Sequence, residues 1–525
     1  MKRINVTVCL FLLLSALIFK GCSGDSKAHQ IVQTLNSIRD LYNIDAIKKM
    51  NLGDLKWVKD RSSILEDGTL LLEGNFISGT WETISKDDLD NGRIDNTVSL
   101  SVTHPVKLYI PPGYPELPNV GYGAMIALQT EKEFNNIDVD HEKIFVKPAI
   151  EEGIPVIIHA NYDTLWLGRG YNGANELMSA SARLMMLRGD ATVENMRLLL
   201  LYSYIRENLM AITLMQRLLE AEGGHLNKGV IAHGGSKQGF ANWLQAMVDD
   251  RVKVSVPINI QLQDYIAGTE RYITDWGCNE ATECTSGFTV EDRLDMRDWI
   301  LNTETGQIFN NIYDISVQQD LLFPQFFVVS SDVTSPGHHD CQFPLGADSS
   351  FLKGLKREWR GFRTIDSTAD DDAYWTSKVD PRFEYMWRAS IKELINPSDW
   401  IKVVDVKTEH ITSSELKISA FLENYHNSPK VTLWYASSTN RAWNDLEQVN
   451  SWKYRSMVRD NDVWLITVDV PLDKEWAYFV EVEDADESGQ TRIDASPVEF
   501  FNEFPMEQCT LKRQKRPLVS GRTAP

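Results

Sequence analysis

The sequence has few basic residues for its size. Its 53 Lys and Arg are outnumbered by 74 Asp and Glu, which gives a formal net charge of −21. Such a surface repels nucleic acid phosphates and anionic lipid head groups, so neither is expected as a main partner. Beyond the N-terminal region, no uncharged apolar run reaches the roughly 18 residues of a membrane-spanning helix. The longest candidate, residues 196–215, is interrupted by Arg197, Arg206 and Glu207.

Cysteine is also scarce, with six residues in the chain. They form no paired C-x-x-C elements, so a zinc ribbon is not expected. We predict no metal or other cofactor. Cys278 and Cys284 lie close together in a loop-like stretch, which allows a local disulfide in an oxidising compartment or, alternatively, two free buried thiols.

The N-terminal region has the pattern of a bacterial export signal. Basic residues precede an apolar stretch at 6–19, and small residues follow around Cys22. We therefore predict a signal peptide at 1–21 and a protein exported to the cell envelope or periplasm. Cys22 resembles the lipidated cysteine of lipoproteins, although Phe19 and Lys20 depart from that pattern. A lipid there is the only membrane contact we expect, and an uncleaved N-terminal anchor is the alternative.

The middle of the chain alternates short apolar runs with helical stretches. The runs are typical of strands buried on both faces, and this alternation predicts a parallel sheet with right-handed crossovers. They are residues 154–160, 229–233, 252–260 and 325–331, with helices predicted at 197–222 and from 236 to 248. Residues 69–77, 79–84 and 97–110 have the pattern of antiparallel edge strands.

These patterns predict an α/β fold, a doubly wound and mostly parallel sheet with a helical insertion, followed by an all-β, sandwich-like module. The expected segments are a leader at 22–50, an α/β domain at 51–396 with a helical cap at 264–322, a β-sandwich-like domain at 397–503 and a disordered tail at 504–525.

The strongest motif joins a buried strand to a helix through residues 234–239, Gly-Gly-Ser-Lys-Gln-Gly. A strand, a tight turn with small residues and a helix are the context of a nucleophile elbow, with Ser236 as the nucleophile. The backbone N–H of Lys237 is then expected to stabilise an oxyanion. Gln238 departs from the strict pattern, because the glycine comes one position later. A plain tight connection or a phosphate cradle are the alternatives, although no Gly-Lys-Ser/Thr ending supports a P-loop.

The elbow block resembles the PhoPQ-activated pathogenicity-related proteins, which are exported proteins with an α/β-hydrolase fold. The matching features are residues 234–239, Trp243, the Val248–Val252 stretch (VDDRV) and Val256-Pro257. The resemblance extends loosely over residues 55–500. It implies an α/β-hydrolase-like domain with a Ser, acid and His in chain order.

The resemblance assigns the acid to Asp332, just past the strand at 325–331; an Asp that caps a turn is the alternative. The family's histidine follows the next strand, for which residues 359–365 are the match, but residues 366–372 contain none. His338 and His339, in an apparent insertion after Asp332, are the remaining candidates. With Asp340 and Cys341 they could instead bind a metal ion, although adjacent residues of an extended loop point to opposite sides.

A second oxyanion donor is expected near Asn161 or Tyr162, after the strand at 154–160. His159 and His233 are interpreted as hydrogen-bonded core histidines. The preferred hypothesis is a serine hydrolase of ester or amide bonds in a small-molecule or peptide substrate. The alternative is a binding or signalling protein that keeps the scaffold without the base, since a serine without a base is a weak nucleophile.

Overall fold

The computed structural model covers the whole chain, and the structure describes part of it. The described residues are 38–161, 169–171, 174–188, 192–258, 265–276, 290–324, 326–332, 349–364, 381–397, 400–426, 428–438, 452–486 and 489–501.

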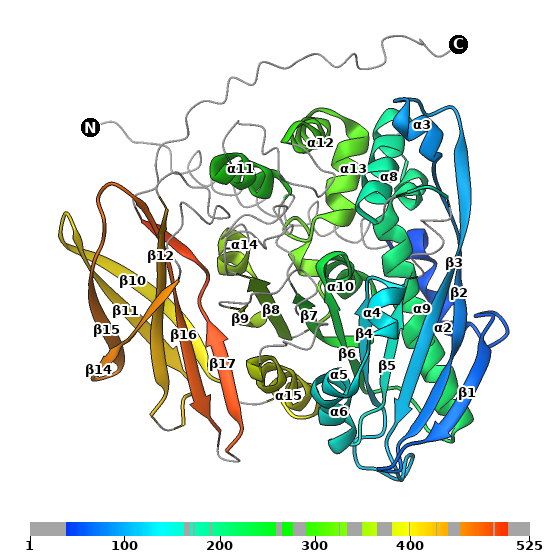
Figure 1. Ribbon diagram of the computed structural model, residues 1–525, viewed down its shortest axis with the longest axis horizontal. Coiled ribbons are helices and arrows are strands. Elements are labelled where there is room, and N and C mark those ends of the chain that lie inside the picture. Colours follow the sequence, from blue (N-terminus) through cyan, green and yellow to red (C-terminus); the bar gives the residue numbers. More distant parts are fainter. Residues whose placement is uncertain are drawn as a thin grey trace, which may run out of the picture.

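A nine-stranded mixed sheet forms the centre of the molecule (Figure 1). Its spatial order is β1-β2-β3-β5-β4-β6-β7-β8-β9. The first three strands pair antiparallel, β3 also pairs antiparallel with β5, and every pair from β5 to β9 is parallel. The strands are β1 (Val58–Ile64), β2 (Leu70–Ile84), β3 (Thr97–Ile110), β4 (Tyr122–Leu128), β5 (Val156–Ala160), β6 (Gly229–Gly235), β7 (Val252–Ile258), β8 (Phe326–Asp332) and β9 (Glu358–Thr364).

This strand order confirms the predicted α/β-hydrolase-like sheet. The swap of β4 and β5 places two consecutive strands out of sequence order, which helical crossovers permit. Two details differ from the sequence-based expectation. The segments 69–77 and 79–84 form one strand, β2, with a bulge between Ile77 and Gly79, where Gly79 has φ +121. Strand β4 was not predicted, yet it is buried in the sheet beside β6.

Helices cover both faces of the sheet (Figure 1). The long helix α9 is almost wholly buried and packs against α10 and α2. It begins after a short 3₁₀ turn, Glu194–Leu198, so the helix predicted at 197–222 starts later than expected. Helices of the α/β part include α2 (Ile44–Lys49), α4 (Glu131–Asn135), α5 (Val139–His141), α6 (Lys147–Glu151), α8 (Ala174–Arg188), α9 (Leu200–Ala221), α10 (Ser236–Val248), α14 (Ser349–Gly354) and α15 (Pro381–Ile395).

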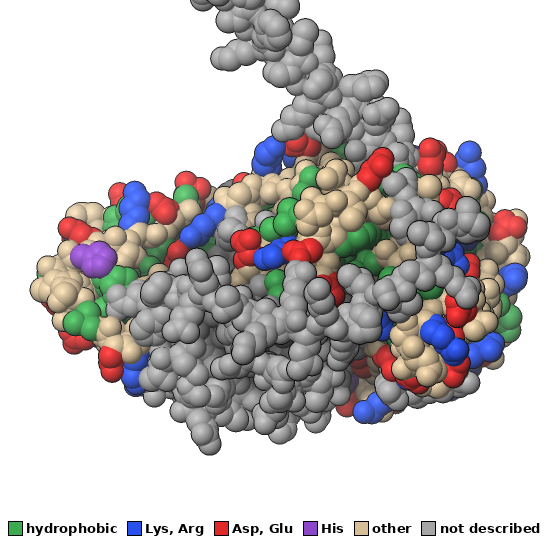
Figure 2. Space-filling view, turned by 90° about the horizontal axis from the view of Figure 1, so that it is seen from above, with side chains coloured by type: hydrophobic (Ala, Val, Ile, Leu, Met, Phe, Trp, Pro, Cys, Tyr) green, Lys and Arg blue, Asp and Glu red, His purple; other side chains and the backbone are tan. Residues whose placement is uncertain are grey.

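Between β7 and β8 the described residues include three α-helices, which lie together at one end of the sheet, the top of Figure 1. They are α11 (Tyr265–Trp276), α12 (Val290–Asn302) and α13 (Glu304–Tyr313). The ring of Tyr265 packs against Phe240 of α10 and Phe309 of α13, which joins the insertion to the core. Seen from this end, hydrophobic side chains lie among acidic and basic ones on the described surface (Figure 2).

The C-terminal strands form a separate pair of antiparallel sheets beside β9, at the left of Figure 1. Their order is β10-β11-β15-β14 in one sheet and β13-β12-β16-β17, with β18 also on β16, in the other. This all-β arrangement confirms the predicted module. The strands are β10 (Lys402–Thr412), β11 (Glu415–Glu423), β12 (Lys430–Ser438), β13 (Lys453–Ser456), β14 (Val458–Asp460), β15 (Val463–Asp469), β16 (Glu475–Ala485), β17 (Thr491–Ala495) and β18 (Glu499–Phe501).

Buried polar contacts join this module to the central sheet. The carboxylate of Asp494 on β17 accepts hydrogen bonds from the backbone N–H groups of Gly361 on β9, at 2.7 Å, and of Val403 on β10, at 2.6 Å. A Cβ on Gly361 would lie 2.1 Å from the carbonyl oxygen of Ala495, so this close approach requires glycine. The two parts therefore share one continuous packed interface.

None of the helices in the described part of the chain combines the length and apolar character needed to cross a bilayer.

Candidate functional site

The turn from β6 into α10 has the strained geometry that the motif predicts. Gly235 is extended, with φ −100 and ψ 154, and the next residue, Ser236, has φ +50. This left-handed conformation is uncommon for a residue with a side chain and costs about 1 kcal/mol or more. Strand and helix meet at Ser236 with no intervening loop, and its side chain is mostly buried, at 8% exposed.

Two glycines make the sharp turn sterically possible. A Cβ on Gly234 would lie 2.9 Å from the carbonyl carbon, carbonyl oxygen and Cβ of Gln238. A Cβ on Gly239 would lie 2.6 Å from the carbonyl oxygen of Ile258 and 3.0 Å from that of Gly234. The first turn of α10 thus packs directly on the ends of β6 and β7. This contact explains why the glycine is needed at 239, one position later than in the strict motif.

Gln238 belongs to a buried polar cluster behind the elbow. Its Nε2 donates a hydrogen bond to Oε1 of Glu207, and its Oε1 accepts one of 3.2 Å from Asn208 Nδ2. Asn161 Nδ2 also donates to Glu207 Oε1, at 3.3 Å. All four side chains are fully buried. A side chain longer than glycine at position 238 is therefore tolerated because it points into a polar interior.

Strand register places the predicted acid at the same edge of the sheet as Ser236. Gly235 pairs with Ile258 on β7, which in turn pairs with Ser330 on β8. Ser236 is one residue after Gly235 on β6, and Asp332 is two residues after Ser330 on β8. Because β6, β7 and β8 are parallel, both residues lie at the carboxyl edge, where α/β folds bind their ligands. The side-chain position of Asp332 lies outside what the structure describes.

The second oxyanion donor near Asn161 or Tyr162 stays a prediction, although the strand order favours another loop beside the elbow. The strand at 156–160 is not next to β6, because β4 pairs between them. The loop that borders the elbow therefore begins at Gln129, after β4, and Lys237 Nζ donates a 3.4 Å hydrogen bond to Gln129 Oε1. Asn161 instead turns its side chain into the buried cluster around Glu207. Sequence reasoning missed this loop because β4 was missed; the apolar run at 122–128 was the available signal.

Several predicted residues lie outside the described part of the chain. These are Tyr162, the candidate bases His338 and His339, the cysteine pair Cys278 and Cys284, and Cys22.

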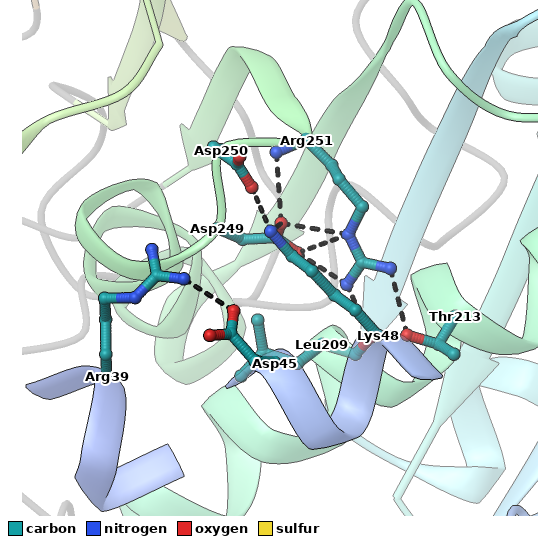
Figure 3. A network of polar contacts seen from close by, with 8 residues as sticks. All are labelled: Arg39, Asp45, Lys48, Leu209, Thr213, Asp249, Asp250 and Arg251. Carbon is teal, nitrogen blue, oxygen red and sulfur yellow. Dashed lines mark hydrogen bonds and ion pairs between the residues drawn. The ribbon is translucent and has the colours of Figure 1, made fainter. Parts of the chain in front are cut away.

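The Val248–Val252 stretch, one of the features that carried the resemblance, forms a buried ion-pair network (Figure 3). Arg251 binds the fully buried carboxylate of Asp249 through Nε, at 2.9 Å, and Nη2, at 2.8 Å. The same guanidinium donates to Thr213 Oγ1 and to the carbonyl oxygen of Leu209, both on α9. The turn between α10 and β7 is thereby fixed to the helix that supports the elbow.

A small apolar cavity lies between the helical insertion and α10. Phe240, one turn after Ser236 on α10, forms part of its wall together with Tyr265 of α11 and Phe309 of α13. Met178 of α8 and Leu200 of α9 complete the wall, and Ser236 is not among the lining residues.

With this geometry, the comparison with known families is informative. The model of the PhoPQ-activated pathogenicity-related protein family matches residues 189–332. This segment is therefore similar to that family. It includes α9, the elbow, the Arg251 turn, the helical insertion and β8, so the resemblance inferred from the elbow block is confirmed. No curated protein sequence is significantly similar to the chain.

Solved structures with similar folds include several esterases. An acetyl xylan esterase from Paenibacillus sp. R4 is 10% identical with a TM-score of 0.34, over 63% of this chain and 87% of that one. An S-formylglutathione hydrolase from Agrobacterium tumefaciens is 13% identical with a TM-score of 0.35, over 66% and 100%. A glucuronoyl esterase from Caldicellulosiruptor kristjansonii is 13% identical with a TM-score of 0.31, over 69% and 85%. At such values the argument for the fold rests on the strand order, and that for function on the site.

Proposed function

We propose that the protein is a serine hydrolase that cleaves ester or amide bonds, with Ser236 as its nucleophile. The observation that carries the proposal is the φ of +50 at Ser236, between β6 and α10. A strained non-glycine residue at a strand-to-helix turn, with glycines packed on either side, needs a functional reason to be retained. A nucleophile elbow supplies that reason.

In this reaction Ser236 Oγ attacks the carbonyl carbon of the substrate and transfers its proton to an imidazole. The oxyanion that forms accepts a hydrogen bond from the backbone N–H of Lys237, in the first turn of α10, where the helix leaves N–H groups free. The imidazole then gives the proton to the departing alcohol or amine. Water, activated by the same imidazole, hydrolyses the acyl-enzyme and restores Ser236.

For the base we propose His338 or His339, oriented by Asp332. Asp332 ends β8 at the carboxyl edge, and the two histidines follow it within a few residues in sequence. In an exported protein, as the N-terminal pattern predicts, the substrate is met outside the cytoplasm.

Labelling with a fluorophosphonate probe tests this function. We expect the folded wild-type protein to be labelled at Ser236 and the Ser236→Ala variant to remain unlabelled. The His338→Ala/His339→Ala double variant should label at least about 100-fold more slowly, because general-base catalysis contributes that much. His410→Ala, in the β module, is the matched control and should label at the wild-type rate. Absence of labelling in wild type, or an unchanged rate in the double variant, contradicts the proposal.

One observation favours a second candidate, a non-enzymatic binding or signalling protein on the same scaffold. Between β9 and α15, where this fold usually carries its catalytic histidine, residues 365–380 contain none. Such a protein would leave Ser236 unreactive toward the probe while remaining folded. A cooperative thermal transition without labelling would therefore select this alternative.

Export with a lipid on Cys22 is a separate proposal, supported by residues 1–24 alone. Metabolic labelling with a radioactive fatty acid should mark the full-length protein and fail for Cys22→Ala. Labelling of both, or of neither, would contradict lipidation.

A further inference from the structure

A polar groove lies between the two sheets of the C-terminal module, where β13 meets the end of β15. Its volume is about 400 Å³, which is within the range of small-ligand sites. Both sheets contribute to the lining, which includes Tyr435 and Ser437 of β12, Lys453 and Arg455 of β13, Asp469 of β15, and Lys474 just before β16. None of the described residues of the α/β part lines the groove, so it is separate from the site around Ser236.

The basic side chains of the groove have few partners. Among the described residues, those of Lys453 and Lys474 take part in no ion pair or hydrogen bond. Arg455 Nη1 donates a 3.3 Å hydrogen bond to the carbonyl oxygen of Thr467 on β15. Because a guanidinium has several more N–H donors, this bond orients Arg455 and still leaves donors for a ligand.

The charge of the groove differs from that of the whole chain. Of the four charged residues described in its lining, three are basic and one, Asp469, is acidic. The chain as a whole has a net charge of −21. A local excess of positive charge in a concave site attracts a ligand that carries negative charge.

We propose that this groove binds an acidic saccharide, a short stretch of sugar rings that bear carboxylate groups. The fork of Arg455 matches a carboxylate in two parallel hydrogen bonds, and the ammonium of Lys453 adds a second cation. The carboxylate of Asp469 accepts hydrogen bonds from sugar hydroxyl groups. The site does not depend on the proposed hydrolase activity, since none of these residues takes part in it.

Strand register places the cations beside an aromatic surface. Lys453 and Arg455 are two residues apart on β13, so their side chains lie on the same face of the sheet. Lys453 pairs with Tyr435 on β12, and the ring centroid of Tyr435 lies 5.7 Å from that of the buried Trp476. Tyr435 is half-buried and thus presents part of its ring to the groove. An aromatic surface beside charged groups matches a sugar, which has C–H groups on one ring face and polar groups at its edge.

The same features disfavour other anions. A nucleic acid extends far beyond a groove of this volume, and the net charge of the chain repels its phosphates. A compact anion without hydroxyl groups would bring its charge close to Asp469 and gain nothing from that residue. A saccharide uses both signs of charge, because its carboxylates meet the cations and its hydroxyl groups meet Asp469.

Isothermal titration calorimetry of the full chain tests the ligand class. The trimer of galacturonic acid should bind saturably, and the neutral galactose trimer at least about tenfold more weakly, because the charge-assisted hydrogen bonds are lost. Equal binding of the two trimers, or no binding of either, would overturn the proposal. Citrate carries three carboxylates without a sugar ring. If citrate binds as tightly as the acidic trimer, the ligand is not a saccharide and the proposal is wrong.

A matched pair of variants tests the location. Arg455→Gln should weaken binding of the acidic trimer by about tenfold or more. Arg459→Gln, on β14 and outside the groove lining, loses the same charge and should bind within about twofold of wild type, because salt screens distant charges. Both arginines are exposed, so both variants should keep the wild-type Tm. Unchanged binding in Arg455→Gln, or equal weakening in the two variants, would contradict this location.

Fluorophosphonate labelling keeps this proposal distinct from the hydrolase. The rate of labelling at Ser236 should be the same in wild type and Arg455→Gln. A wild-type protein that binds the acidic trimer but is not labelled would contradict the hydrolase and leave the groove supported. The reverse result would overturn the groove alone.

Discussion

The side-chain amide of Gln238 donates a hydrogen bond to Glu207, and so links the residue two positions after Ser236 to the buried face of α9. Because a second amide, from Asn208, binds the Oε1 of Gln238, the elbow is held to that helix by a polar network rather than by apolar packing alone.

Gln238→Ala should therefore destabilise the fold by about 1–3 kcal/mol, because Glu207 loses a donor and Asn208 an acceptor in a buried environment. The free energy of unfolding from a denaturant titration measures this effect. The matched control is Gln216→Ala. Gln216 is also on α9, and its side-chain amide donates a hydrogen bond to Glu220 at the surface. The free energy of unfolding of this variant should stay within about 0.5 kcal/mol of the wild-type value. Equal effects of the two variants would show that the network contributes nothing.

Gly239→Ala should be costly in spite of adding one methyl group. Its Cβ would lie 2.6 Å from the backbone oxygen of Ile258, which cannot move aside as a side-chain tip would. We expect a loss of about 1–3 kcal/mol, typical of overpacking. Gly354→Ala, at the exposed end of α14 with no atom within 4 Å of the new Cβ, serves as the control and should be close to neutral. The midpoints of denaturant unfolding compare the two; a neutral Gly239→Ala would refute the close packing of α10 on β7.

Arg251 and Asp250 are adjacent in sequence but should differ in importance. Arg251→Ala removes the guanidinium that is hydrogen-bonded to the fully buried carboxylate of Asp249, and breaking a buried pair in this way costs about 3–5 kcal/mol. Asp250→Asn only weakens a partly exposed contact with Lys48, for which about 0–1 kcal/mol is expected. Thermal unfolding of both variants checks the contrast. Similar shifts in Tm would mean that the Arg251 network is not the anchor of this turn.

Asp494 should make stability depend on pH. Burial raises its pKa to about 6 from 3.8, despite its backbone hydrogen bonds and the nearby Arg360, which act in the opposite direction. The folded state then binds its proton more tightly than the unfolded state. The contribution of this group to stability is therefore largest below pH of about 4, declines as pH rises to about 6 and is constant above that.

Asp494→Asn removes this titration. The difference in unfolding free energy between wild type and variant should change by up to about 3 kcal/mol between pH 4 and pH 7, at about 1.4 kcal/mol per pKa unit. Asp462→Asn, with a side chain 93% exposed, is the control and should show no comparable slope. A pH-independent difference for Asp494→Asn would contradict the raised pKa.

The sequence alone was sufficient for elements whose patterns are local. The strand at 97–110 was predicted with the bounds that it has, and the helix after Ser236 ends at Val248 as expected. The alternation of apolar and polar residues predicts the strand, and turn residues such as Pro111 and Gly113 mark its end, so both signals lie within a few positions of the element. The elbow was also predictable, because its glycines and its serine are consecutive in the chain.

Tertiary structure decided which loops and side chains meet. The run at 122–128 gains its place only by pairing between β5 and β6, and this pairing puts the loop that begins at Gln129, and not Asn161, beside the strand that leads into the elbow. Likewise, nothing local relates Arg455 to Lys474. They line one groove because β13 of one sheet meets the end of β15 in the other, and the order of strands in a sheet depends on long-range pairing that no short stretch of sequence encodes.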